Sequence, residues 1–228
     1  MPFIVGLSLG LIAYNAALNL VPFPRWSYVP LNLALAAALL AVARARGLSW
    51  EALGLSPEHL GSGLRWGFGA AAVVAVAVTI GVVAGDRIPG VERLLADRRA
   101  TGISGLGLAY ETLIRIPLGT ALFEEVAFRG VLLAAAADRW SLVSAVVVSS
   151  VVFGLWHIGP GLVTLRLNEP GLSVAGQILG VAAMVGVTTV AGVVFCWLRI
   201  VSGSLLAPIV AHWSTNALGL LAAAQAQR

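Results

Sequence analysis

Long apolar runs alternate with short polar stretches along this chain, and the spacing of the runs predicts its architecture. A helix needs about 20 apolar residues to cross the hydrocarbon core of a bilayer. Runs of this kind lie near residues 3–20, 28–44, 64–85, 107–136, 141–158, 174–199 and 204–223. The pattern therefore predicts an all-α fold, a polytopic membrane helix bundle with about seven transmembrane helices.

The composition supports a membrane protein and excludes several other classes. Hydrophobic residues make up 59% of the chain and charged residues 11%, and the mean hydropathy is +0.95; soluble domains carry about 25% charged residues. All 14 basic residues are arginines, and they stand singly or in pairs at segment ends, where they anchor helices. We therefore expect the lipid bilayer as a partner and no nucleic acid. The single cysteine, Cys196, excludes an intrachain disulfide.

A hydrophilic stretch at residues 86–101 divides the chain into two predicted parts. Residues 1–100 comprise three membrane helices and this linker, and residues 101–228 comprise a four-helix catalytic core. The first three runs carry small residues at spacings that let helices pack closely, and they have no ionisable group at mid-depth. We interpret the first part as support for the second.

The polar ends of the runs predict how the chain lies in the membrane. The first run lacks a basic leader and a cleavage site, so we expect a membrane helix and not a removable signal peptide. Residues 49–65 mix leucines with polar residues and are expected to lie on the membrane surface. With the N-terminus outside, more arginines fall on the cytoplasmic side than on the opposite side. We expect an integral protein of a bacterial-type cell membrane.

Two adjacent carboxylates and a guanidinium interrupt the fourth apolar run. They belong to Glu124, Glu125 and Arg129. On a helix, Glu125 and Arg129 are four residues apart with the acid first, which is the favourable order for an ion pair. Glu124 lies about 100° further round the axis, so it needs a partner from another helix.

Two later runs supply such partners. His157 follows Phe153 by one helical turn, so the phenyl ring can wall the imidazole. His212 and Asn216 are also one turn apart and share a helix face. Convergence of the three helices places one carboxylate, two imidazoles and a carboxamide around one point.

This set of groups has the parts for peptide hydrolysis by water. A carboxylate assisted by a histidine can take a proton from water, while a second histidine and an amide stabilise the oxyanion. Glu124, His157 and His212 can alternatively bind zinc. A purely structural network between helices is the third interpretation. We favour a functional site because ionisable groups are costly inside a membrane, and we favour a metal-free mechanism because zinc would occupy the carboxylate that serves as base.

Three motifs in these runs resemble those of a known family. EExxxR occurs at Glu124–Arg129, FxxxH at Phe153–His157 and HxxxN at His212–Asn216. The chain is thereby similar to the CPBP family of intramembrane proteases, which includes CAAX prenyl endopeptidases and bacteriocin-processing or bacteriocin-immunity proteins. The resemblance covers residues 107–220 and implies a role for each motif position.

By this resemblance, Glu124 and His157 activate the water, His212 and Asn216 stabilise the oxyanion, and Glu125 and Arg129 support the site. The implied activity is that of an intramembrane endopeptidase, acting on a membrane-associated and possibly lipidated protein or peptide, with a site that faces the cytoplasm. Family members have been described both as metalloproteases and as metal-free glutamate proteases, so the cofactor is either zinc or none. The alternative functions are a non-catalytic immunity or scaffold protein and a small transporter with a Glu/His proton relay.

Two further features lie near the fourth run. Residues 102–105 spell the GxSG of rhomboid-type serine proteases, but Ser104 directly follows the polar linker and is predicted to be a helix N-cap. Pro117 precedes the acidic pair. It either kinks the helix and frees a backbone carbonyl near the site, or is a tolerated membrane proline.

Overall fold

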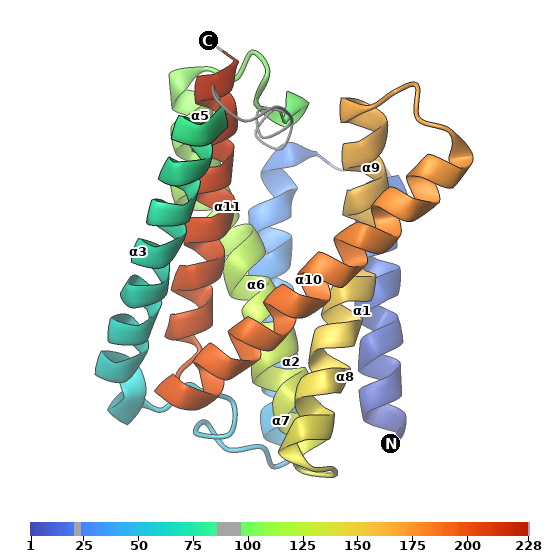
Figure 1. Ribbon diagram of the computed structural model, residues 1–228. Coiled ribbons are helices and arrows are strands. Elements are labelled where there is room, and N and C mark those ends of the chain that lie inside the picture. The colour runs from blue at the N-terminus through green and yellow to red at the C-terminus, as the bar shows by residue number, and fades with distance from the viewer. Residues whose placement is uncertain (21–23, 86–96, 228) are drawn as a thin grey trace.

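The computed structural model describes residues 1–20, 24–85 and 97–227, and every regular element in these ranges is a helix (Figure 1). The longer helices are α1 (Pro2–Leu20), α2 (Tyr28–Ala45), α3 (Leu60–Gly85), α8 (Leu142–Trp156), α9 (Ile158–Asn168), α10 (Val174–Ser202) and α11 (Leu206–Ala226). Single-turn elements are η1 (Arg25–Ser27), η2 (Pro57–His59) and η3 (Arg98–Ala100). The predicted all-α class is confirmed.

The described part contains six helical segments that are long and apolar enough to cross a membrane. They are Pro2–Asn19, Arg25–Ala45, Pro57–Gly85, Leu142–Asn168, Val174–Ser202 and Leu206–Ala226. The remaining predicted run, the fourth, is a continuous helical rod made of α5 (Gly105–Tyr110), η4 (Glu111–Ala121), α6 (Leu122–Glu125), η5 (Val126–Leu132) and α7 (Leu133–Ala137). These elements together form the predicted polytopic membrane bundle.

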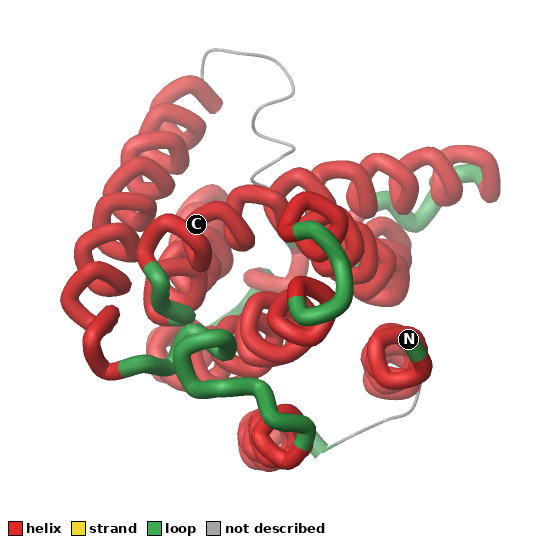
Figure 2. The backbone as a smooth tube through the Cα atoms, turned by 90° about the horizontal axis from the view of Figure 1, so that it is seen from below, coloured by secondary structure: helices red, strands yellow, loops and turns green. Residues whose placement is uncertain are grey.

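The rod from α5 to α7 is the centre of the bundle. Almost every residue from Ala121 to Ala136 is buried. α3 lies at one edge of the molecule and α1 at the other, while α10 crosses obliquely and contacts α3, α8, α9 and α11 (Figures 1 and 2). α1 packs on α8 and α9, α2 on the central rod, and α3 on α11. The N-terminal helices thus make their main contacts with the C-terminal ones, whereas most of the predicted linker, at residues 86–96, lies outside the described residues.

Pro117 stands inside η4, which is a π-helix. In a π-helix each backbone N–H bonds to the carbonyl five residues earlier, and proline has no N–H to offer. The carbonyl five residues before Pro117 is that of Thr112, and it accepts a hydrogen bond of 2.7 Å from Nε1 of Trp213. The proline therefore leaves a carbonyl that joins the central rod to α11 beside His212, while the kink of the first interpretation stays a prediction.

The segment before α3 does not lie wholly on the surface, and this corrects the prediction for residues 49–65. Leu53 is fully buried, and its carbonyl oxygen lies close to Gly130 of the central rod. Arg199 of α10 holds the turn through hydrogen bonds of 3.0 and 2.9 Å to the carbonyl oxygens of Glu51 and Ala52. The turn can carry the leucine into the bundle because this arginine satisfies the carbonyl groups of the two preceding residues.

Two local predictions can be compared with the structure. Ser104 caps α5, since its hydroxyl accepts a hydrogen bond of 3.0 Å from the N–H of Gly107, which confirms the N-cap assignment. The fifth apolar run does not end near residue 158. α8 ends at Trp156, and α9 continues in nearly the same direction to Asn168, so His157 lies at a junction inside one membrane-spanning segment (Figure 1).

Candidate functional site

Glu125 is a fully buried acidic residue of the central rod. Its Oε1 accepts hydrogen bonds from Nη1 of Arg129, at 3.0 Å, and from Nδ1 of His212, at 2.8 Å. The side chains of Glu125 and Arg129 have no exposed surface, and that of His212 is 5% exposed. The ion pair expected from the helix spacing is therefore present, and α11 joins it through an imidazole.

The contact between His212 and Glu125 fixes the orientation of the imidazole. An ionised carboxylate can only accept hydrogen bonds, so Nδ1 of His212 carries the proton. The opposite nitrogen, Nε2, points to Glu124 and lies 4.0 Å from its Oε2. Phe195 of α10 stacks on the imidazole at 5.1 Å between ring centroids. His212 is thus held from three sides between two carboxylates.

The guanidinium of Arg129 is enclosed mainly by aromatic rings. It lies 4.0 Å from the ring centroid of Phe153 and 5.0 Å from that of Phe195. Gly192 lets α10 approach, because a Cβ atom at this position would lie 3.3 Å from Nη2 of the arginine. Within the described residues, Nε and Nη2 of Arg129 have no hydrogen-bond partner. Its charge is therefore balanced by Glu125 and by the negative faces of the rings.

Glu124 differs from its neighbour because its carboxylate is buried but free. The residue is 5% exposed, and its Oε2 makes no hydrogen bond to the described part of the protein. Its electrostatic neighbours include His157 and Tyr28 of α2, in addition to His212. The two adjacent carboxylates therefore lie in different environments. Glu125 accepts hydrogen bonds from two donors, whereas the carboxylate of Glu124 accepts none from the described residues.

His157 lies at the α8–α9 junction and is half-buried. Its Nδ1 is 2.7 Å from the carbonyl oxygen of Phe153, which can only accept, so Nδ1 donates and Nε2 is left free. The Phe153 ring meets His157 edge to face at 4.6 Å and His212 at 6.0 Å. The phenyl ring walls His157, as the one-turn spacing predicts, and it also contacts the second imidazole.

Asn216 lies one turn after His212 on α11 and is partly buried. Among the described residues its side chain has no hydrogen-bond partner. The structure therefore brings together Glu124, Glu125, Arg129, His157 and His212, and places Asn216 on the adjoining turn with a free carboxamide.

Polar side chains of the N-terminal helices also reach this region, which sequence reasoning missed. Tyr14 of α1 donates a hydrogen bond of 2.5 Å to Oδ1 of the buried Asn32 on α2. Tyr28 of α2 is 3.2 Å from the hydroxyl of Thr120 on the central rod. Asn15 of α1 donates to the carbonyl of Trp156, next to His157. Asparagine and tyrosine inside apolar runs were the available signal, since such groups need partners in a membrane.

The predicted zinc ligands do not form a coordination site in this arrangement. Within the described residues, no three His, Cys, Asp or Glu side chains are grouped in a way that can hold a metal ion. His212 presents Nδ1 to Glu125, and His157 presents Nδ1 to a carbonyl. Both contacts engage Nδ1 and leave Nε2 of each ring free, so the choice between zinc and a metal-free mechanism stays a prediction.

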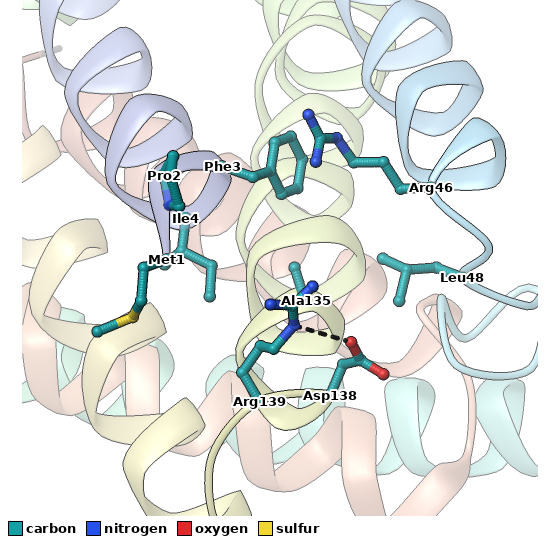
Figure 3. Close-up of a pocket in the computed structure, with 9 residues that line it drawn as sticks. All are labelled: Met1, Pro2, Phe3, Ile4, Arg46, Leu48, Ala135, Asp138 and Arg139. Atoms are coloured by element: carbon teal, nitrogen blue, oxygen red, sulfur yellow. Dashed lines mark hydrogen bonds and ion pairs between the residues drawn. The ribbon is translucent and has the colours of Figure 1, made fainter.

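One cavity of about 390 Å³ lies away from this cluster, near the N-terminal end of α1 (Figure 3). Its lining comprises Met1, Pro2, Phe3, Ile4, Arg46, Leu48, Ala135, Asp138 and Arg139. In the close-up, Arg139 is turned toward Asp138 and Arg46 lies against Phe3. None of the predicted site residues lines it, so it is not the place where Glu124 would meet a substrate.

A bundle of apolar helices that encloses paired carboxylates and imidazoles defines a polytopic membrane protein with an intramembrane polar site. The family model for type II CAAX prenyl endopeptidases, Rce1-like, matches residues 106–218. This range contains all three motifs, and the chain belongs to this family. At the level of the family it is a CAAX-type intramembrane endopeptidase, an integral membrane protein with a protein substrate. No curated protein and no solved structure matches the chain.

Proposed function

We propose that this protein hydrolyses a peptide bond of a membrane-associated protein with a water molecule activated by Glu124, without a metal. The observation that carries the proposal is the buried and unpartnered Oε2 of Glu124, which faces Nε2 of His212 at 4.0 Å. Two atoms at this separation can both lie about 2.8 Å from one oxygen atom, which is hydrogen-bond distance. A water oxygen or a substrate oxygen therefore fits between them.

The reaction begins with proton transfer from water to Glu124. The resulting hydroxide attacks the carbonyl carbon of the scissile bond, and the carbonyl oxygen takes the negative charge. His157, held by the carbonyl of Phe153, offers Nε2 as an acceptor that orients the water. The protonated Glu124 then gives its proton to the leaving nitrogen, which completes the hydrolysis.

His212 and Asn216 are proposed to stabilise the oxyanion. As an imidazolium, His212 donates Nδ1–H to Glu125 and has Nε2–H left for the substrate oxygen. The free carboxamide of Asn216 supplies the second donor. Glu125 and Arg129 hold the imidazole in place and do not exchange protons with the substrate.

Access to the site is proposed to come from the cytoplasmic side. Leu53 and Leu205 are buried and contact Gly130, five residues after Glu125, and we propose that they block entry from the end of the bundle where α7 ends. Substrate would then enter from the opposite end, where η3 and the end of α11 meet. The excess of arginines predicted for that side agrees with a cytoplasmic orientation in a bacterial-type membrane. A prenylated CAAX protein is the substrate class that the family suggests.

The test is co-expression of wild-type and Glu124→Ala proteins with candidate substrates that carry a prenylated C-terminal CAAX sequence. The proposal predicts a shortened product with the wild type alone. Cleavage by both proteins would contradict the role of Glu124. Solute or proton flux through wild-type proteoliposomes, without cleavage, would identify a transporter, and neither activity would identify a scaffold.

A further inference from the structure

The backbone that carries His157 has an unusual hydrogen-bonding requirement. In a continuous α-helix the carbonyl of Trp156 would accept from the N–H four residues later. That position is Pro160, which has no N–H. A carbonyl without a donor is costly inside a membrane, where no bulk water is at hand. The residue immediately before His157 therefore needs a donor from elsewhere in the bundle.

Asn15 of α1 supplies that donor. Its Nδ2 lies 2.5 Å from the carbonyl oxygen of Trp156, and the asparagine is 6% exposed. Nδ2 of Asn19, one turn later, donates to the carbonyl and Oδ1 oxygens of Asn15, at 2.8 and 3.2 Å. Because Oδ1 is engaged in this way, the amide of Asn15 is fixed with its N–H groups toward Trp156.

α1 packs closely around this contact. A Cβ atom at Gly159 would lie 3.2 Å from Nδ2 of Asn19, so the absence of a side chain lets α1 approach the junction. The Trp156 ring lies 6.2 Å from Tyr14 and 5.9 Å from Phe123, the residue before Glu124. Tyr14 and Phe123 are themselves in edge-to-face contact at 5.7 Å. Tyr14 and Asn15 of α1 thus contact Phe123 and Trp156, the residues that immediately precede Glu124 and His157.

We infer that Asn15 is a positioning residue, which sets the place of the His157 imidazole relative to Glu124 through the carbonyl of Trp156. This inference rests on the proposed function in so far as His157 orients the water. It also implies that the active site depends on a helix outside the matched range of residues 106–218. Asn15 acts through the backbone and does not touch the substrate.

The first test compares Asn15→Leu with the matched control Asn32→Leu, which removes another buried asparagine of the N-terminal helices. A displacement of about 1 Å at a catalytic group costs about 10²-fold in rate. We expect Asn15→Leu to lower kcat by about this factor with little change in KM, and Asn32→Leu to lower it by less. Asn19→Ala, which removes only the orienting group, should show a smaller kcat loss and serves if Asn15→Leu does not fold. A wild-type kcat in folded Asn15→Leu would overturn the inference. If Asn15→Leu does not fold, a wild-type kcat in Asn19→Ala would overturn it.

A second variant separates positioning from simple stability. In Asn15→Leu/Pro160→Ala, the new N–H at position 160 can bond to the carbonyl of Trp156, so thermal stability should rise above that of Asn15→Leu. The α8–α9 junction would still lack its anchor to α1, and kcat should stay low. Recovery of kcat to the wild-type level would show that pairing the carbonyl is sufficient, and would overturn the inference.

Nitrogen NMR of histidine-labelled protein distinguishes failure of this inference from failure of the proposed function. Asn15→Leu should shift the ring-nitrogen signals of His157 and leave those of His59 unchanged. If these signals do not move while Glu124→Gln is inactive, the inference alone is wrong. If they move but Glu124→Gln retains full activity, the proposed mechanism is wrong and Asn15 positions His157 without serving that reaction.

Discussion

Replacement of Arg129 by methionine would leave Glu125 charged and buried without its ion-pair partner. Both side chains of this pair are 0% exposed, and their closest atoms are 3.0 Å apart. Loss of one partner from a dry ion pair costs about 3–5 kcal/mol, because the remaining charge has lost its compensation. For a chain of this size each kcal/mol corresponds to about 2–4 °C in Tm. We therefore expect Arg129→Met to unfold about 6–20 °C below the wild type.

The central rod provides a matched control for this experiment. Glu111 and Arg115 have the same four-residue spacing and a separation of 2.9 Å, but their side chains are 24% and 36% exposed. Exposed pairs contribute about 0–1 kcal/mol, so Arg115→Met should shift Tm by only a few degrees. Thermal unfolding in detergent, followed by intrinsic tryptophan fluorescence, measures both variants.

The double variant Glu125→Gln/Arg129→Met completes the test. Two neutral side chains of similar volume remove both charges, so part of the lost stability should return. Activity should remain low because His212 loses the carboxylate that orients it. An Arg129→Met protein as stable as the wild type but inactive would refute this reasoning and assign the arginine to the chemistry.

Two other outcomes follow from the proposed roles. His157→Ala and His212→Ala should each abolish cleavage in proteins that still insert and purify as monodisperse species. Asn216→Ala should lose about 10²–10³-fold in kcat, as expected for one oxyanion donor. Wild-type cleavage rates in either histidine variant would contradict the assignment. Treatment with a chelator should leave cleavage by untagged protein unchanged. The metal-free mechanism would be contradicted if elemental analysis found stoichiometric zinc, and if removing the zinc stopped cleavage and returning it restored cleavage.

The parts of this structure that the sequence predicts are those governed by local spacing. Apolar runs of membrane length give the helices, because a backbone in lipid must satisfy its own hydrogen bonds. The Glu125–Arg129 pair follows from the helical repeat, and the Ser104 cap follows from the preference of serine for helix starts. Each of these features depends on residues that are close together in the sequence.

The features that the sequence did not predict depend on packing between distant segments. His212 meets Glu125 across 87 positions, and Asn15 meets Trp156 across 141. The spacing within one helix shows which face a residue occupies but not which neighbour it faces. Leu53 was expected at the surface because its neighbours are polar, yet Arg199 satisfies their backbone and the leucine is buried. The orientation of His212 between two carboxylates likewise required the tertiary structure.

The most direct test of the account is the cleavage rate of purified Glu124→Gln in proteoliposomes, measured beside the wild type on a prenylated CAAX protein. The substitution preserves the shape of a buried side chain that has no hydrogen-bond partner at Oε2, so the fold should be kept. The amide cannot accept a proton from water, so the account predicts no detectable product at a wild-type Tm. Wild-type cleavage by Glu124→Gln would contradict it.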